Sequence, residues 1–484
     1  MSKIRFHKEV APALRGVKRV VVVAQARRLR KLPKVFDADL QAHLEALADV
    51  ADAGQMGQTV STLTGSAPQT LTLAAIPSRA SHHNHPARLP TVERLLAAVR
   101  NDTDGPVAVV LIPEKAAWLP GLVAAASRAF PTFDARSKNG ARDLHVVALD
   151  VRGRPVAVPP ALQHTVVAAR EAARLVDTPP SEMNPTRLAD EAKTMFRGLK
   201  GVKVTEIAGD KLVQNGLMGI HSVGRAATEP PRMIVATYTP AKKSALHVAL
   251  VGKGITFDTG GLHLKGRGSM EGMKSDMGGS AAVLGAFRAL VENRCPHRVT
   301  LILCIAENAI GPSAFKPDDI VTMHSGKTVE INNTDAEGRL LLGDGVSWAA
   351  RKLKVDVIFD AATLTGAQMI STGVQHAAVM TNDPKLETHL VKSGQASGDL
   401  CHPLLFAPEL FQQEFKSPVA DMRNSVKNRM NAQSSCAGQF VYSHLEGTDV
   451  RWVHVDLAGP AFRGERGTGY GVALLHEAVN TLKA

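Results

Sequence analysis

The chain contains few cysteines, few aromatic residues and no long apolar run. Its 484 residues include four cysteines, Cys295, Cys304, Cys401 and Cys436, and none of them forms a C-x-x-C pair. This spacing predicts neither a disulfide framework nor a thiolate zinc site, and it favours a reducing compartment. No apolar stretch approaches the roughly 20 residues that a membrane-spanning helix needs, and no signal-peptide pattern opens the chain. We therefore expect no membrane partner.

Acidic residues are scarce at the start of the chain. Glu9 is the only acid among residues 1 to 34, and the whole chain carries 57 Lys and Arg against 45 Asp and Glu, a net charge of +12. Three interpretations stay open: a solvated basic face, a short organelle-targeting segment, or a nucleic-acid contact patch. The cytoplasm is the first compartment expected, and the basic start makes the mitochondrial matrix the alternative.

Two regions of different pattern follow one another. A β-branched run at 17–24 predicts a buried strand, apolar residues at helical spacing predict a helix over 36–50, and further strands are expected at 107–113 and 145–151. These elements predict a small N-terminal α/β domain over residues 1–158. A helical pattern over 159–178, ended by Pro179 and Pro180, predicts a linking helix.

Residues 179–484 are expected to form a larger catalytic domain. Apolar strand patterns at 247–252, 299–305, 355–361 and 452–459 alternate with helical patterns such as 280–293. This alternation is typical of a mostly parallel sheet flanked by helices. The predicted fold class is thus α/β, with two domains.

The candidate catalytic and metal-binding residues follow the strands of this second region. Open α/β sheets bind their ligands at the carboxyl ends of their strands. Lys253 and Asp258 come after one strand, and Asp258 is followed by Thr259 and two glycines. Lys265 lies in the next loop, and Asp276 lies just ahead of a helix. If the segment after the following strand is extended, Asp335, Glu337 and Arg339 point to one side, because side chains alternate along a strand.

Four carboxylates in one pocket favour bound cations. The side chains of Asp258, Asp276, Asp335 and Glu337 would repel one another and raise their own pKa values unless cations neutralised them. Two divalent ions match that charge, and oxygen-rich ligation suits Zn²⁺, Mn²⁺ or Mg²⁺. Lys253 is the candidate nitrogen ligand, since an ammonium beside two cations loses its proton readily.

Three segments of this chain resemble the leucyl aminopeptidase family of metallopeptidases, M17. They are NTDAEGRL at 333–340, VGKGITFDTGG at 251–261 and MKSDMGG at 273–279, and the resemblance runs over roughly residues 160 to 480. Within the family the chain looks most like the aminopeptidase-like-1 branch, through DTGGLHLKG, HSGKTVEINNTDAEGRL, SRASHHNHP and SRAFPTF.

The resemblance implies a role for each matched residue. Five residues would ligate two divalent metals, with the second and fifth bridging them: Lys253, Asp258, Asp276, Asp335 and Glu337. Lys265 would polarise the substrate carbonyl and stabilise the oxyanion. Arg339 would hold a bicarbonate ion that acts as general base on the bridging water. The pocket for the first side chain would be lined by Met273, Thr363 and Gly366.

The function implied is a metal-dependent aminopeptidase (EC 3.4.11). It would remove the N-terminal residue, leucine or another apolar residue, from peptides with a free N-terminus through a water that bridges two metals. The resemblance also implies a homohexamer. The alternative is a nucleic-acid-binding or structural subunit of a larger complex that keeps the aminopeptidase fold, which the basic charge allows.

Overall fold

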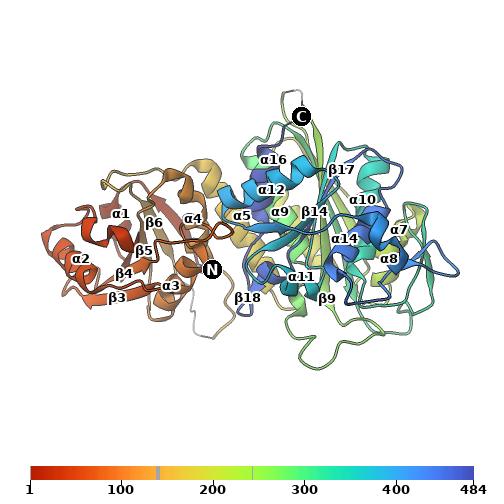
Figure 1. Cartoon of the computed structure of the whole chain (residues 1–484), viewed down its shortest axis with the longest axis horizontal. Helices are drawn as coiled ribbons and strands as arrows, with labels where there is room; N and C mark the ends of the chain where they lie inside the picture. Colours follow the sequence, from red (N-terminus) through yellow and green to blue (C-terminus); the bar gives the residue numbers. More distant parts are fainter. Residues whose placement is uncertain (1, 138–141, 243, 484) are drawn as a thin grey trace. The chain divides into compact units, whose positions relative to one another are not determined.

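A computed structural model describes residues 2–137, 142–242 and 244–483 (Figure 1). The chain divides into two compact units. The first contains Met1–Arg170 and Gly394–Leu400, and the second contains Glu171–Ser393 and Cys401–Ala484. The helical pattern expected over 159–178 forms helix α5, Pro160–Asp177, and the division between the units falls within this helix.

The first unit is built on a six-stranded sheet in the order β1-β6-β5-β2-β4-β3. All neighbouring strands are parallel except β3 and β4. The strands are β1 Ile4–His7, β2 Arg19–Gln25, β3 Gln58–Leu63, β4 Thr70–Ile76, β5 Val107–Leu111 and β6 Leu144–Ala148. The helices between them are α1 Val10–Leu14, α2 Ala38–Val50, α3 Leu89–Asn101 and α4 Leu119–Arg128.

The β-branched run of β2 is buried on both faces. Val20 and Val22 pack in one apolar cluster with Leu44 of α2, whereas Val21 and Val23 pack in another with residues of α3 and α4. Successive side chains of a strand point to opposite faces, so a strand covered on both sides must be apolar throughout. The α/β architecture predicted for this region is confirmed.

The second unit is built on an eight-stranded sheet in the order β15-β14-β17-β13-β9-β10-β8-β7. Its centre, β17-β13-β9-β10, is parallel, and antiparallel pairs join β14 to β17, β10 to β8 and β8 to β7. The strands are β7 Val202–Ala208, β8 Arg232–Tyr238, β9 His247–Asp258, β10 Arg298–Asn308, β13 Val357–Ala362, β14 Ala377–Thr381, β15 Cys401–Pro403 and β17 Arg451–Asp456.

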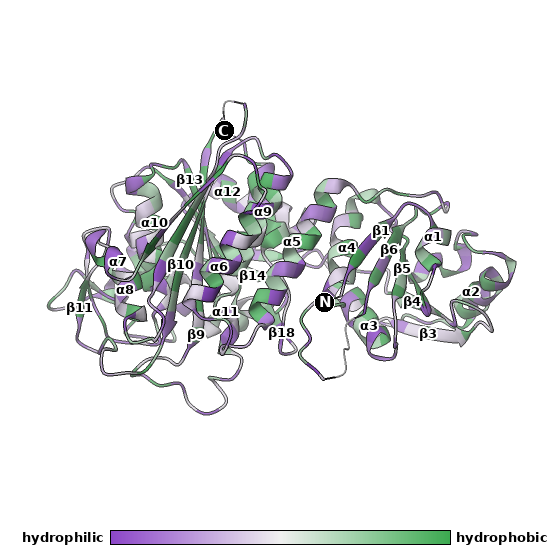
Figure 2. Cartoon of the chain, turned by 180° about the vertical axis from the view of Figure 1, so that it is seen from behind, coloured by the Kyte–Doolittle hydropathy of each residue, from purple (hydrophilic) through white to green (hydrophobic). Residues whose placement is uncertain are grey.

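Helices cover both faces of this sheet, and the strands between them are strongly hydrophobic (Figures 1 and 2). On one face α9 lies against β9, and a Cβ atom added to Gly252 would lie 2.5 Å from Val283 of this helix. On the other face a Cβ atom added to Gly345 of α10 would lie 2.7 Å from Val251. Adjacent residues of β9 therefore meet different helices. The helices of this unit include α8 Met218–Gly224, α9 Gly278–Glu292, α10 Gly338–Ser347, α11 Gly366–Ser371, α14 Gln433–Ser443 and α16 Val472–Asn480.

A small third sheet lies at the edge of this unit. It contains β11 Ile320–Thr322, β12 Thr328–Glu330 and β16 Met422–Arg423, with β12 antiparallel to β11 and parallel to β16. The remaining helices of the unit include α6 Pro185–Phe196, α7 Asp210–Gln214, α12 Pro384–Ser397, α13 Pro408–Phe411 and α15 Ala458–Ala461. Among the described residues, no helix combines the length and the apolar character needed to cross a bilayer.

Candidate active site

Carboxylates from two loops meet at the carboxyl end of β9. Asp258 is the last residue of β9, and Asp335 and Glu337 lie in the segment ahead of α10. One carboxylate oxygen from each of these three residues lies within 4.8 Å of the others. Asp258 and Glu337 are buried, and Asp335 is half-buried. Like charges this close are unfavourable unless cations lie among them.

The glycines that follow Asp258 shape its loop. Gly260 has φ +84°, and a Cβ atom there would lie 2.4 Å from the carbonyl oxygen of His263, so the turn requires glycine. The backbone N–H of Gly260 donates to Asp258 Oδ1 at 2.8 Å, and Asn308 Nδ2 donates to the same oxygen at 2.8 Å. These two bonds orient one oxygen of the carboxylate.

The segment that carries Asp335 and Glu337 is a turn, not the extended strand that we considered from the sequence. The side chain of Asn333 accepts a hydrogen bond from the backbone N–H of Asp335 at 2.9 Å, which closes a tight local turn. Glu337 is the N-cap residue of α10, and Arg339 lies in the first turn of that helix. The alternation argument for these side chains was therefore wrong, because turn geometry and a helix start set their directions.

Lys253 joins Asp276 to this group. Its Nζ atom lies 2.8 Å from Asp276 Oδ1 and 3.0 Å from Glu337 Oε1, and it donates to the carbonyl oxygen of Thr363 at 2.9 Å. Burial alone would lower the pKa of Lys253, but the charges of Asp276 and Glu337 outweigh it and raise the pKa. These contacts describe an ammonium. To act as a neutral nitrogen ligand, Lys253 must lose this proton. Bound divalent cations would then supply the positive charge that balances the carboxylates.

Lys265 pairs with the other two carboxylates of the group, Asp258 and Asp335. Its Nζ atom is 2.8 Å from Asp258 Oδ2 and also forms an ion pair with Asp335. Burial opposes its charge, but the carboxylate of Asp258 outweighs this effect and raises the pKa of Lys265. The Lys265 side chain is therefore a cation held directly beside the carboxylates.

The positive charges of Lys253 and Lys265 do not fully balance the negative charges of the carboxylates. Burial, reinforced by the charge of Glu337, raises the pKa of Asp258 to about 6, and burial also raises the pKa of Asp276 well above its ordinary value. For Glu337, burial is outweighed by Lys253 and Lys265, so its pKa is lowered. Asp276 Oδ2 is buried with no hydrogen-bond partner among the described residues. Oxygen donors with uncompensated negative charge fit divalent cations.

Arg339 is a buried cation with unused hydrogen-bonding capacity. Only 6% of the residue is exposed, and its Nη1 atom donates to the carbonyl oxygen of Asn424 at 3.0 Å. Its Nε atom has no partner in the described part of the chain. Burial lowers the pKa of Arg339 to about 10. A small anion would satisfy both the charge and the free donor.

Two of the three residues expected to line the specificity pocket, Thr363 and Gly366, belong to the connection from β13 to α11, and Met273 lies on a separate segment. Thr363 is buried, and its hydroxyl donates to Asp276 Oδ1 at 2.9 Å, so it touches the acidic group directly. Met273 begins the short 3₁₀ helix η3, Met273–Ser275, and its carbonyl oxygen accepts from the N–H of Asp276 at 3.1 Å. Gly366 is exposed at the start of α11.

The sequence analysis missed two residues that support the site, Asn308 and Asn424. Asn308 Nδ2 binds both Asp258 and the carbonyl oxygen of Thr334. Asn424 is fully buried, and its Oδ1 atom accepts from the backbone N–H groups of Asn332 and Asn333. A lone Asn gives no local signal of such a role, because its partners lie up to 92 residues away.

Family models match both parts of the chain. The catalytic domain of the cytosol aminopeptidase family matches residues 170–476, and M17 aminopeptidase N-terminal domain 2 matches residues 18–139. The chain is 46% identical to mouse "Probable aminopeptidase NPEPL1" over 414 residues, which cover 84% of this chain and 78% of that protein.

Solved structures of aminopeptidases are also similar to this chain. The apo structure of leucyl aminopeptidase from Trypanosoma cruzi is 38% identical, with a TM-score of 0.91, and the match covers 100% of this chain and 97% of that one. The bottromycin maturation enzyme BotP in complex with Mn is 26% identical, with a TM-score of 0.77, over 96% of this chain and 99% of that one. The chain therefore belongs to the M17 cytosol aminopeptidase family, as the resemblance of its motifs indicated.

Proposed function

We propose that this protein is a metal-dependent aminopeptidase that hydrolyses the N-terminal residue, leucine or another apolar residue, from peptides. The observation that carries the proposal is the meeting of Asp258, Asp335 and Glu337 within 4.8 Å, with Asp276 joined to them through Lys253. The family match supports the same activity, and the solved relative BotP, a complex with Mn, supports a metal cofactor.

In this proposal five residues hold two divalent metals, Zn²⁺ or Mn²⁺ with Mg²⁺ as a further candidate: Lys253, Asp258, Asp276, Asp335 and Glu337. Bound there, the metals would supply Lewis-acid polarisation of the scissile carbonyl and an activated water. Lys265 has the charge and the place to stabilise the oxyanion that develops on the substrate.

Arg339 is proposed to hold a bicarbonate ion as the general base. Its buried charge and its Nε atom, which has no partner among the residues that the structure describes, support this role. The side chain of the first residue is proposed to lie against Met273, Thr363 and Gly366. Ala461 is buried near this wall, since a Cβ atom added to Gly278 would lie 3.1 Å from Thr363 and 3.2 Å from Ala461. A small residue at position 461 leaves room for a large first side chain.

The test compares leucine amide with N-acetyl-leucine amide on protein stripped of metal and reloaded with Mn²⁺ or Zn²⁺. We expect hydrolysis of the free amine only, and only after reloading, because the α-amine is to be recognised at the metal-carboxylate site. Equal cleavage of the acetylated compound, or inactivity of the reloaded protein on every free-amine peptide, would reject the proposal. A series of amino-acid amides then defines the first-residue preference.

A homohexamer stays a prediction from the family resemblance, and a cytoplasmic location, with the mitochondrial matrix as alternative because of the basic start, stays a prediction from the sequence. Light scattering of the active protein tests the first, and sequencing of the mature N-terminus from cells tests the second. The alternative function, a nucleic-acid-binding or structural subunit, also stays a prediction. Salt-dependent retention on DNA, compared with a variant whose early basic residues are neutralised, tests it.

A further inference from the structure

The loop that contains Lys265 is hydrogen-bonded to the turn that contains Asp335 through one threonine. Thr334 is fully buried, and its hydroxyl donates to the carbonyl oxygen of Gly260 at 2.7 Å. The same hydroxyl oxygen accepts from the backbone N–H of His263 at 2.8 Å. One side chain therefore holds two points of a loop that lies 71 or more residues earlier in the chain.

The ring of His263 adds a bond in the opposite direction. The backbone N–H of Thr334 donates to His263 Nδ1 at 3.1 Å. The hydroxyl of Thr334 also lies 3.3 Å from Nδ1, but its only proton is donated to Gly260, so it cannot donate to the ring. Nδ1 is therefore an acceptor, and the proton of the neutral imidazole lies on Nε2.

Polar contacts, more than apolar burial, hold this part of the loop. His263 is exposed, and its neighbours Leu262 and Leu264 are 45% and 57% exposed. By contrast, the loop backbone approaches the turn closely at Gly261, where an added Cβ atom would lie 3.0 Å from Thr334 Oγ1. The hydrogen bonds between His263 and Thr334 thus fix a segment that burial leaves largely free.

We propose that His263 is a positioning residue for the proposed hydrolysis. Its ring, with the proton on Nε2, holds the loop against the turn, and His263 stands two residues before Lys265. The ammonium of Lys265 is thereby kept beside Asp258 and Asp335, where it can stabilise the oxyanion. The inference rests on the proposed function, because His263 acts through the role of Lys265.

Two variants of similar size test the acceptor on the ring. His263→Asn offers Oδ1 at the same distance from Cβ as Nδ1, whereas His263→Leu has the same branched shape and no acceptor. We expect kcat for leucine amide to fall about 10- to 100-fold in His263→Leu and to stay within about 3-fold of the wild type in His263→Asn. KM and metal content should change little, because the turn keeps its hydrogen bonds to Asn424.

A double-mutant cycle shows whether His263 acts through Lys265. Once the ammonium is removed, its position no longer matters. Adding His263→Leu to Lys265→Ala should therefore lower kcat by at most about 2-fold. A merely structural role of His263 would instead lower kcat by the same factor in both backgrounds.

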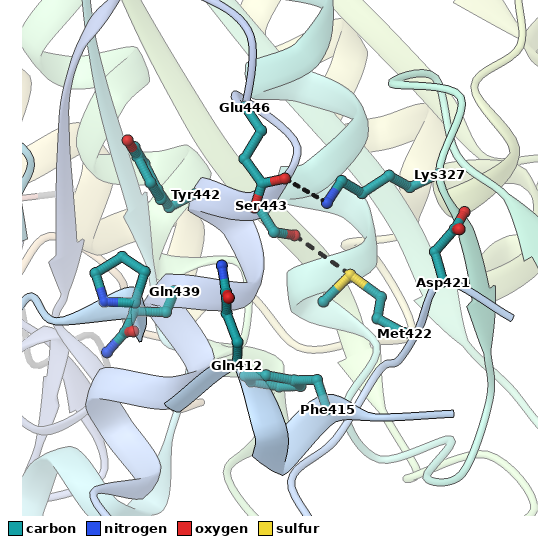
Figure 3. Close-up of a pocket in the computed structure, with 10 residues that line it drawn as sticks. Lys327, Gln412, Phe415, Asp421, Met422, Gln439, Tyr442, Ser443 and Glu446 are labelled. Carbon is teal, nitrogen blue, oxygen red and sulfur yellow. Dashed lines mark hydrogen bonds and ion pairs between the residues drawn. The ribbon is translucent and has the colours of Figure 1, made fainter. Parts of the chain in front are cut away.

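Lys327→Met is the control for the loss of a contact between distant segments. It breaks the 2.7 Å ion pair between Lys327 Nζ and Glu446 Oε2, which lies at a pocket lined by no residue of the carboxylate cluster (Figure 3). This variant should keep the kcat of the wild type.

Amide hydrogen exchange at Thr334 tests the connection without substrate. Exchange of this N–H should be at least about 5-fold faster in His263→Leu than in the wild type, and it should stay slow in His263→Asn. If His263→Leu aggregates, His263→Ala, which also lacks an acceptor, replaces it in every measurement.

Three results would overturn the inference: equal exchange at Thr334 in all three proteins, a kcat of His263→Leu equal to that of the wild type, or the same loss of kcat in both backgrounds of the cycle. Each of these leaves the proposed function in place, since the wild type is active. A metal-loaded wild type that hydrolyses no free-amine peptide would instead reject the proposed function itself, and with it the catalytic consequence of His263.

Discussion

Arg339 Nη1 donates a 3.0 Å hydrogen bond to the backbone carbonyl of Asn424, 85 residues further along the chain. The side chain of Asn424 meanwhile binds the turn ahead of α10 through the backbone N–H groups of Asn332 and Asn333 and the carbonyl oxygens of Asn333 and Ala336. One buried residue therefore positions both the candidate anion site and the turn that carries two of the candidate metal ligands.

Asn424→Asp tests this connection. The substitution keeps the shape but replaces the amide donor, which faces two carbonyl oxygens, with an acceptor. We expect metal affinity and kcat to fall by about 10- to 100-fold each, as is usual when a group that orients metal ligands is changed. Both are measured on the same preparation, by metal titration and by steady-state kinetics. Asn428→Asp, at an exposed position that keeps its acceptor role, is the control; an equal loss in both variants would contradict the positioning role.

Lys265→Ala separates catalysis from metal binding. The ammonium of Lys265 lies beside Asp258, and the proposed role acts on charge that develops in the transition state. We expect the variant to keep its metals and to lose about 10²- to 10³-fold in kcat. Asp276→Ala, by contrast, should lose metal as well as activity, because it removes a ligand. Metal content and kcat are measured side by side, and a Lys265→Ala enzyme with near-normal kcat would refute the role.

Gly279→Ala tests the close approach of α9 to the sheet. A Cβ atom at this position would lie 2.1 Å from the carbonyl oxygen of Ala361, a backbone atom of β13 that cannot move independently. We expect the free energy of unfolding to fall by about 3 kcal/mol or more, since the helix must shift. Gly266→Ala has nothing within 4 Å of its added Cβ atom and should change stability by at most about 0.5 kcal/mol. Chemical denaturation of both variants gives the comparison, and a mild effect at Gly279 would show that α9 can move freely.

The stability of the fold should decrease in acid through His444. This residue is fully buried, and burial lowers its pKa to about 3, while Ser325 lies 2.7 Å from its Nδ1 atom. The unfolded chain takes up a proton near pH 6.5 and the folded chain does not, so stability present above pH 6.5 is lost as the pH falls. By pH 5 the loss is about 2 kcal/mol.

His444→Asn should reduce this dependence between pH 6.5 and pH 4, although lost packing against Phe440 lowers its stability by an amount independent of pH. The slope of the unfolding free energy against pH is therefore the quantity to compare. If the slope of His444→Asn equals that of the wild type, His444 is not the titrating group.

The sequence alone was sufficient for the α/β class and for most of the strands and helices near the site. Local sequence patterns predicted the strands β2, β9, β10 and β13. These strands are buried on both faces, so nearly all of their residues must be apolar. The candidate site residues could also be recognised in short sequence segments, since Asp258, Asp276 and Glu337 each lie at or next to the start or end of a helix or strand.

Only the tertiary structure decided how those segments meet. The turn at 332–337 depends on Asn424, and the orientation of Asp258 depends on Asn308, which is 50 residues away. Local periodicity specifies which face of an element is buried, whereas hydrogen bonds between distant loops arise only once the sheet has brought the ends of its strands together.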